Sequence, residues 1–134
     1  MSIMGREVSI KPAIVLALCM VVGALIPAMS KTPSREITLV ARGMAFYLEN
    51  DLEKPNPPIE LRAGETVRVV LRNEEPGMRH DFAVPALRGA SMASLDWNET
   101  GELTLRVPDQ PGTYEYTCRP HRLMMRGTLR VVPN

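Results

Sequence analysis

Apolar and polar residues alternate with a period of two along most of the chain after residue 35. In 66–72, for example, Val67, Val69 and Leu71 would share one face of a half-buried strand. The other strand candidates are 37–41, 44–47, 59–61, 78–84, 103–107, 113–118 and 127–132. No stretch of this region keeps a helical period. Short strands separated by Gly and Pro turns predict an all-β fold, a two-sheet antiparallel sandwich of about seven strands.

Two connections interrupt this pattern. Residues 49–58 are charged and carry three prolines, so they predict a loop. Residues 86–100 are the least regular and predict either a loop or a short helical turn, in which Trp97 would be a packing or loop anchor. Tyr114, which follows the turn 109–112, resembles the tyrosine corner of β-sandwiches. Both interruptions fit a sandwich whose longer connections lie outside the strands.

The N-terminal segment has the pattern of an export signal. Arg6 and Lys11 precede an uncharged apolar run over 12–29, and Ala28 and Ser30 supply the small residues that a signal peptidase reads. An uncleaved membrane anchor is the alternative, since the run is close to the ~17 residues needed to cross a bilayer. Either interpretation places the rest of the chain in the periplasm or another extracytoplasmic space. We expect a signal or anchor over 1–30, a linker over 31–36 and one domain over 37–134.

Charge and cysteine content narrow the function. Residues 31–134 hold 14 Lys or Arg and 14 Asp or Glu, which argues against nucleic-acid binding. The only membrane contact that the sequence predicts is through an uncleaved N-terminal segment. Cys19 lies in that segment, so Cys118 would be the only cysteine of the exported domain. A single cysteine cannot form an internal disulfide, and this favours a metal thiolate as its role.

Cys118 lies in a run of side chains that bind metals. His121 follows three residues later, Met124 and Met125 come next, and His80, the only other histidine, lies 38 residues upstream. Two imidazoles, a thiolate and a weak thioether form the ligand set of a trigonal copper site. This set holds both Cu(I) and Cu(II) with little rearrangement, so it suits one-electron transfer. The loop has no second cysteine, which argues against a binuclear copper site.

The run 111–121 resembles the C-terminal copper loop of the cupredoxins, the small blue (type 1) copper proteins. Its Cys-x-x-His spacing is similar to that of the plastocyanin, pseudoazurin and amicyanin types, and the Met-x-Gly ending is similar to the amicyanin type. The resemblance implies a Greek-key β-sandwich, one bound copper ion per chain and electron transfer. It maps the family's ligands onto four positions, which are His80, Cys118, His121 and a methionine.

Two positions depart from the family's pattern. Met125 is the preferred axial ligand because it comes directly before the strand that carries Gly127, and alternation lets only one of two adjacent side chains point inward. Met124 is the alternative ligand, and otherwise it would lie at the surface beside His121. Asp81 stands where the family usually has an asparagine that braces the copper loop. An aspartate there would be either protonated or paired with a nearby arginine.

Four arginines flank the proposed ligands and should cluster at the copper end. They are Arg79, Arg119, Arg122 and Arg126. They would favour Cu(I) and steer an acidic redox partner toward the exposed edge of His121, or they are solvated loop charges. In the family that edge lies in an apolar patch, which Pro120, Leu123 and Met124 would supply here.

The residues and the resemblance together predict an exported, monomeric electron carrier. Its partners would be redox proteins, and it would have no catalytic residues of its own. A copper chaperone or storage protein is the first alternative, and exposed, labile Met and His sites would favour it. A copper enzyme with an open coordination position is the second, and a water in place of the methionine would favour it.

Overall fold

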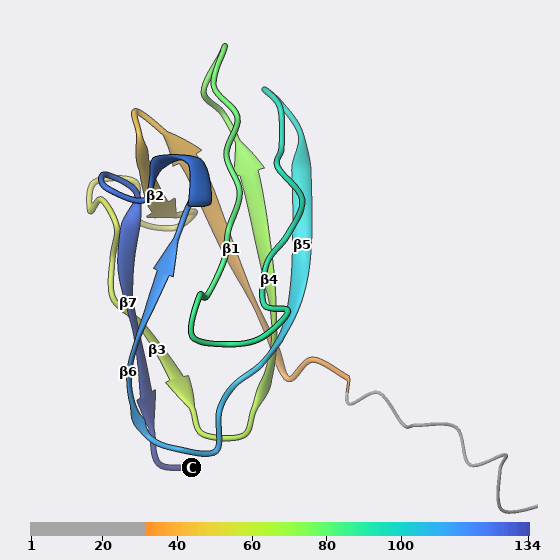
Figure 1. The fold of residues 1–134 in the computed structure, drawn as a ribbon, viewed down its shortest axis with the longest axis vertical. Helices are drawn as coiled ribbons and strands as arrows, with labels where there is room; N and C mark the ends of the chain where they lie inside the picture. The colour runs from red at the N-terminus through yellow and green to blue at the C-terminus, as the bar shows by residue number, and fades with distance from the viewer. Residues whose placement is uncertain (1–31) are drawn as a thin grey trace, which may run out of the picture. The chain divides into compact units, whose positions relative to one another are not determined.

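The computed structural model describes residues 32–134, which form two β-sheets packed face to face (Figure 1). The first sheet has the strand order β2-β1-β4-β5, and the second has the order β3-β7-β6. The strands are β1 (Arg35–Arg42), β2 (Ala45–Leu48), β3 (Ile59–Arg62), β4 (Thr66–Asn73), β5 (Thr100–Arg106), β6 (Gly112–Thr117) and β7 (Arg126–Val132). Within this range the only helical element is one 3-10 turn, η1 (Arg119–His121). The predicted all-β fold of about seven strands in two sheets is confirmed.

Two of the strand pairings are parallel, which corrects the antiparallel sandwich expected from the sequence. β1 runs parallel to β4, with Ile37 beside Val69, and β3 runs parallel to β7, with Leu61 beside Val131. The pairs β1–β2, β4–β5 and β6–β7 are antiparallel. Between each pair of parallel strands the chain crosses to the other sheet and back. Such a crossover lets two neighbouring strands run in the same direction, which a tight hairpin does not.

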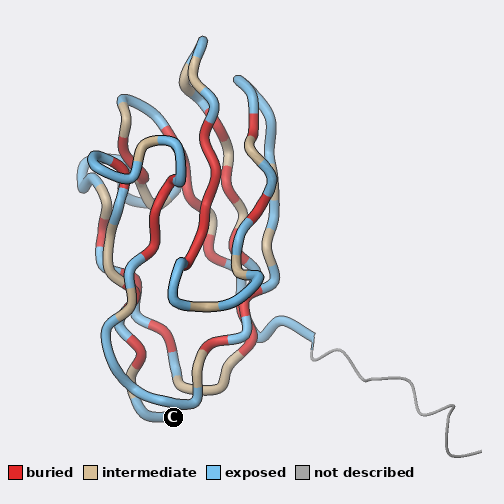
Figure 2. The backbone as a smooth tube through the Cα atoms, viewed as in Figure 1, coloured by how far each residue is buried: buried red, intermediate tan, exposed pale blue. Residues whose placement is uncertain are grey.

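Alternation within the strands builds the core between the sheets. In β4, Val67, Val69 and Leu71 are buried, as predicted, while Arg68 lies at the surface. Figure 2 shows buried and exposed positions alternating along the strands of both sheets. Burying a side chain of this size stabilises the fold by about 1.5–3 kcal/mol. The alternating pattern is therefore what commits these segments to strands.

Three aromatic rings occupy the core below the end of β6. Phe82 stacks on Tyr116 at 5.5 Å between centroids, and Phe46 meets the two rings edge-on at 6.0 and 5.6 Å. The Tyr116 hydroxyl donates a hydrogen bond to the carbonyl oxygen of Pro57 at 2.6 Å. Gly127 lies directly against this ring, since a Cβ there would be 2.3 Å from Tyr116 Cζ. Only glycine fits at that position without displacing the tyrosine.

The predicted strand over 78–84 is not a regular strand. All its residues from position 80 onward are buried (Figure 2), yet they pair only through isolated bridges, such as His80 with Leu95 and Ala83 with Thr117. In the view of Figure 1 the segment runs between β6 and β4. It meets one neighbour after another, so no continuous ladder forms. An apolar run predicts burial, whereas a ladder also needs a partner that runs alongside it.

The remaining expectations have mixed outcomes. Residues 86–99 form a loop, one of the two predicted alternatives, and Trp97 is 52% exposed, so the packing role among its two predicted roles is wrong. The tyrosine corner is confirmed, because the Tyr114 hydroxyl donates to the carbonyl oxygen of Gln110 at 3.0 Å. β1 begins at Arg35, so the last two residues of the expected linker belong to a strand.

The predicted signal or anchor over 1–30 lies outside the described residues. Across the described part of the chain, none of the helical structure is long or apolar enough to cross a membrane.

Candidate metal centre

His80 enters the site from the buried segment between the sheets. Its backbone N–H donates to the carbonyl oxygen of Leu95 at 3.1 Å, and its own carbonyl accepts from the Leu95 N–H at 2.7 Å. Asn73, at the buried end of β4, donates through Nδ2 to the carbonyl oxygens of Met78 at 2.7 Å and Leu95 at 3.1 Å. These bonds hold the backbone on both sides of His80, whose side chain is fully buried. The position of the His80 backbone, from which the imidazole extends, is therefore fixed by the fold.

The loop 118–125, between β6 and β7, carries the other candidate ligands. It opens with η1, where Pro120 favours the turn because proline suits the first residues of a helix. The His121 N–H donates to the Cys118 carbonyl at 3.1 Å, and the Met125 N–H donates to the His121 carbonyl at 2.8 Å. The Cys118 N–H donates back to the Met125 carbonyl at 2.9 Å. The loop thus closes on itself, with its first and last residues hydrogen-bonded.

Three potential ligand atoms converge at this end of the sandwich. One ring nitrogen of His80, one of His121 and the sulfur of Cys118 all lie within 4.8 Å of one another. The sulfur is 3.8 Å from Nδ1 of His80 and 3.5 Å from Nδ1 of His121. With metal bonds of about 2.3 Å to sulfur and about 2.0 Å to nitrogen, ligand atoms at 120° would lie about 3.7 Å apart. The observed spacing therefore fits a single trigonal ion.

The two adjacent methionines face opposite environments. Met125 is 0% exposed and lies in the core, whereas Met124 is 60% exposed. Both residues lie in the turn that precedes β7, where their backbone N–H groups donate to the His121 carbonyl oxygen at 3.0 and 2.8 Å. This burial supports Met125 over Met124 as the fourth ligand.

Glu75 contacts the far nitrogen of His80, and no pattern in the sequence indicates this contact. Its Oε2 lies 2.8 Å from Nε2 of His80 and also accepts a hydrogen bond from the Met44 backbone N–H at 3.0 Å. When Nε2 carries the proton, it donates a hydrogen bond to the carboxylate, and Nδ1 keeps its lone pair for a metal. Glu75 sits in a turn five residues before His80, and no local spacing rule links the two positions.

Asp81 is paired with an arginine, one of the two alternatives expected from the sequence. Its Oδ2 accepts from Nε of Arg119 at 2.7 Å, and its Oδ1 accepts from the Arg119 backbone N–H at 2.8 Å. Asp81 is 2% exposed, so its charge needs this partner. The aspartate therefore braces the loop that begins at Cys118, with a charged pair in addition to a backbone bond.

The sulfur of Cys118 is buried, and burial raises the pKa of its thiol. The Asp81 backbone N–H, 3.5 Å from the sulfur, favours the thiolate and opposes that shift. Metals bind the thiolate, so metal binding displaces this proton. The ligand is held ready in the core but is protected from solvent until a metal enters.

His121 is the most exposed of the three converging residues. It lines a surface depression of about 370 Å³, whose other lining residues are Met44, Pro120, Arg122, Leu123 and Met124. Leu123 is 88% exposed, so this edge is strongly apolar. The patch expected from Pro120, Leu123 and Met124 is present around the histidine.

The four arginines expected to cluster at the copper end differ in their surroundings. Arg119 turns onto the buried aspartate, and Arg79 donates to a backbone carbonyl of a neighbouring loop at 3.1 Å. Arg126 is exposed at the start of β7. Arg122 is the one that lines the depression around His121. A single field of four free charges around the histidine is therefore not what the structure shows.

Asn56 is a second contributor that sequence reasoning missed. It has a positive φ of 47°, which asparagine tolerates better than most residues. Its Oδ1 accepts from the Phe46 backbone N–H at 3.0 Å, and its Nδ2 donates to the Met124 carbonyl at 3.1 Å. Asn56 thereby ties the proline-rich loop 49–58 to the loop 118–125. An asparagine in a turn-rich segment suggested a loop but not this long-range contact.

A family model described as "Copper binding proteins, plastocyanin/azurin family" matches residues 49–132. The matched region contains all four proposed ligands. No curated protein matches the chain significantly.

Several solved structures share the fold. Auracyanin B is 24% identical with a TM-score of 0.63, covering 78% of this chain and 94% of that chain. Auracyanin A, described as a "blue" copper protein from Chloroflexus aurantiacus, is 22% identical with a TM-score of 0.57, covering 72% and 98%. A copper-containing nitrite reductase from Thermus scotoductus SA-01 is 22% identical with a TM-score of 0.56, covering 75% of this chain but 28% of that one. At these identities the likeness establishes the fold.

Proposed function

Because this chain belongs to the plastocyanin/azurin family of copper-binding proteins, we propose that it is an exported electron carrier that cycles one copper ion between Cu(I) and Cu(II). The observation that carries the proposal is the convergence of His80, Cys118 and His121, whose ligand atoms lie within 4.8 Å of one another. A thiolate with two imidazoles is acceptable to both oxidation states. When bound, copper supplies the one-electron chemistry.

The chain's own contribution is to hold the ligands still. His80, Cys118, His121 and Met125 are the proposed ligand set. The backbone N–H of each of the four donates to a carbonyl oxygen of the surrounding chain, and Glu75 also contacts the ring of His80. A frame that does not move when the charge of the ion changes keeps the reorganisation small, which favours fast electron transfer.

The partly exposed His121 is the proposed point of electron exchange. The apolar side chains of Leu123 and Met124 surround it and offer a surface that a partner can desolvate. Redox proteins are the proposed partners, and the carrier acts as a monomer with no substrate of its own. The small, open surface around the histidine suits brief encounters rather than a permanent complex.

Export is part of the proposal and rests on the sequence. The uncharged run 12–29, preceded by basic residues, supports a signal or an anchor that places the domain in an extracytoplasmic compartment. There the single cysteine of the domain would be protected from oxidation by metal ligation and burial.

A copper enzyme is an alternative, because the chain is similar in fold to a copper-containing nitrite reductase. An enzyme needs an open coordination position for its substrate. Full burial of Met125 and Cys118 opposes such an opening from the core side and favours the carrier. The exposed Met124 beside His121 is the feature that favours a copper chaperone.

The test is the visible and EPR spectra of the protein loaded with Cu(II), measured beside Cys118→Ser. We expect an intense visible band and a narrow copper hyperfine splitting in the wild type, both lost in the variant because the thiolate is their source. The zinc-loaded wild type is the control and should show no visible band, since Zn²⁺ has a full d shell. A pale copper protein with ordinary tetragonal signals would remove the carrier proposal and favour the alternatives.

A further inference from the structure

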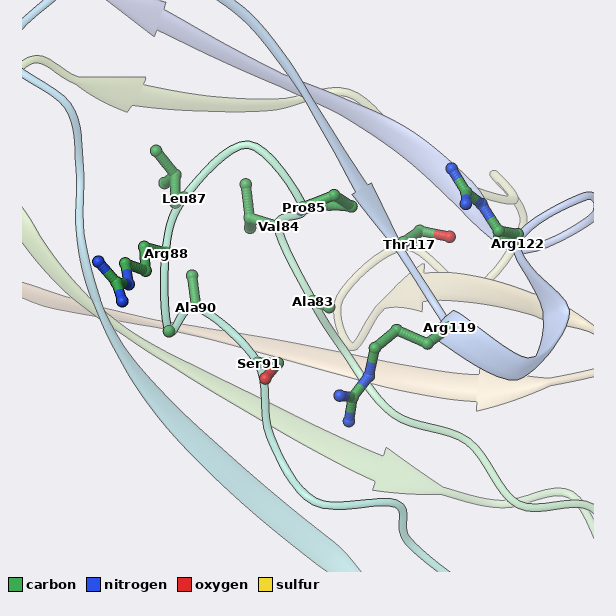
Figure 3. Close-up of a pocket in the computed structure, with 11 residues that line it drawn as sticks. Ala83, Val84, Pro85, Leu87, Arg88, Ala90, Ser91, Thr117, Arg119 and Arg122 are labelled. Atoms are coloured by element: carbon green, nitrogen blue, oxygen red, sulfur yellow. The ribbon is translucent and has the colours of Figure 1, made fainter.

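A second depression lies beside the metal-site loop, on the face formed by the loop after the His80 segment (Figure 3). It has a volume of about 370 Å³. Its lining is largely apolar and includes Val84, Pro85, Leu87 and Ala90, which are labelled in Figure 3. Thr117, the residue before the candidate ligand Cys118, closes it on the side of β6. The depression therefore reaches the metal-site loop without containing any of the proposed ligands.

Three arginines surround this apolar lining. They are Arg88, Arg119 and Arg122, and none of the residues that line the depression is acidic. Within residues 32–134, Arg88 and Arg122 form no salt bridge, unlike four of the eight arginines of the strands. Arg119 is held in place by Asp81 and by the Met92 carbonyl at 2.9 Å, yet its side chain remains 53% exposed. Arg88 and Arg122 thus present positive charge that no acidic side chain of the described residues pairs with, whereas the charge of Arg119 is paired with Asp81.

The walls of the depression are held by backbone hydrogen bonds. The Val84 N–H donates to the Ala90 carbonyl at 2.8 Å, and the Leu87 N–H donates to the Val84 carbonyl at 2.9 Å. On the other side, Ala83 and Thr117 exchange two backbone bonds of 2.9 Å each. A surface that is already ordered loses little conformational entropy when a partner binds.

We propose that this arginine-rimmed depression is a docking site for an acidic, apolar-flanked segment of a redox partner protein. The apolar lining would take a Leu-like side chain, and Arg88 and Arg122 would hydrogen-bond the neighbouring carboxylates. Charge complementarity of this kind raises association rates and selects partners. The proposal rests on the proposed electron-carrier function, and it adds a surface distinct from the apolar edge at His121.

Arg122 connects the two surfaces because it lines both depressions. A segment bound at the arginine rim would therefore hold the rest of its protein close to His121. Arg119 offers a second link, since it follows the ligand Cys118 and binds the aspartate that follows His80. The docking site is thus placed where it can orient a partner without covering the electron-exchange edge.

The test uses the copper-loaded protein reduced to diamagnetic Cu(I) and two synthetic peptides. One is acetyl-Leu-Glu-Glu-Leu-amide and the other is its neutral counterpart with Gln in place of Glu. Backbone NMR shifts locate the binding site and give the affinity. We expect the acidic peptide to shift the amides of 83–91 and Thr117 more than those of 123–125, and the neutral peptide to shift neither.

Matched variants show whether the arginines of the rim bind the acidic peptide. Arg88→Gln and Arg122→Gln should each lower the affinity for the acidic peptide about tenfold, the usual effect of losing one charge-assisted hydrogen bond. Arg130→Gln removes the same charge from β7, away from the lining residues, and should change the affinity less than about twofold. Equal weakening by all three variants, or shifts confined to 123–125, would overturn the proposal. If the peptide fails to bind while the oxidised protein keeps its visible band, only the docking site is lost and the carrier function stands.

Discussion

The loop 118–125 has ends and a tip in opposite environments. Its ends, Cys118 and Met125, are fully buried and joined by a backbone hydrogen bond of 2.9 Å. Its tip, Leu123 and Met124, is 88% and 60% exposed. His121 lies between the two and is partly exposed. One short loop therefore serves both the core and the surface.

The difference shows how a small domain can combine a rigid metal centre with an exposed apolar surface. The ends are held by packing in the core and by hydrogen bonds, so their side chains have one arrangement. The tip is held mainly through its backbone, with the Met124 carbonyl bound by Asn56 at 3.1 Å. Its side chains remain free to meet a partner. Substitutions at the ends should therefore affect stability and ligation, and those at the tip should affect encounters.

Substitution of the two methionines gives the largest contrast. Met125→Ala should lower the free energy of unfolding of the metal-free protein by about 2–5 kcal/mol, because it leaves a cavity in the core. Met124→Ala, one residue away, should change it by less than about 0.5 kcal/mol. Urea unfolding followed by circular dichroism measures both. Similar losses for the two variants would contradict the division into buried ends and exposed tip.

Gly127→Ala tests the close contact between Gly127 and the Tyr116 ring, which lies in the core next to the loop 118–125. The added Cβ would lie 2.3 Å from Tyr116 Cζ, so the ring must move and the unfolding free energy should fall by about 1–3 kcal/mol. Tyr116→Leu in the same chain replaces the ring by a smaller side chain and should make the combined loss smaller than the sum of the single losses. If thermal unfolding shows that the losses of unfolding free energy are strictly additive, the two residues are not in steric contact.

Glu75→Gln tests whether the carboxylate tunes the buried histidine. Loss of the negative charge beside His80 should favour Cu(I) by about threefold to tenfold, which raises the reduction potential by about 30 to 60 mV. Glu74→Gln is the matched control, since Glu74 pairs with Arg72 at 2.8 Å instead. Cyclic voltammetry gives both potentials. An equal rise in the two variants would assign the effect to general charge and not to the contact with Nε2.

Leu123→Ala should have the smallest effect on the fold, less than about 0.5 kcal/mol, because the side chain already faces solvent. Electron self-exchange between the Cu(I) and Cu(II) forms should nevertheless slow by about threefold to tenfold, as expected for removing an apolar contact worth about 1 kcal/mol. NMR line broadening in mixtures of the two forms measures the rate. An unchanged rate would remove the tip from the electron-exchange surface.

The strands and the candidate metal ligands could both be predicted from the sequence, but for different reasons. Val67, Val69 and Leu71 were readable because burial on one face of a strand repeats every second residue. His80, Cys118 and His121 were readable because few residue types bind copper and the chain contains few of them. The segment 78–84 was misread as a strand because its apolar residues reveal burial but not what they pair with.

The contacts that support the candidate metal ligands could not be predicted from the sequence. Glu75, Asn56 and Asn73 are ordinary turn or strand-end residues in the sequence, and each acquires its role from a partner brought close by folding. For the same reason, the sequence alone allows two alternatives for Asp81, protonation or pairing with an arginine. Its partner, Arg119, is 38 residues away along the chain, and their hydrogen bonds form only when the two sheets close.

The sequence by itself determined that this protein is a β-sandwich with a Cys, His and Met copper loop, because alternation and ligand chemistry are both local properties of the chain. Tertiary structure decided which strands run parallel, which methionine is buried, and which side chains hold His80 and Asp81. It also decided that Arg88 and Arg122 line the same apolar depression. Those outcomes depend on distances between residues far apart in the chain, and only the packing of the two sheets sets such distances.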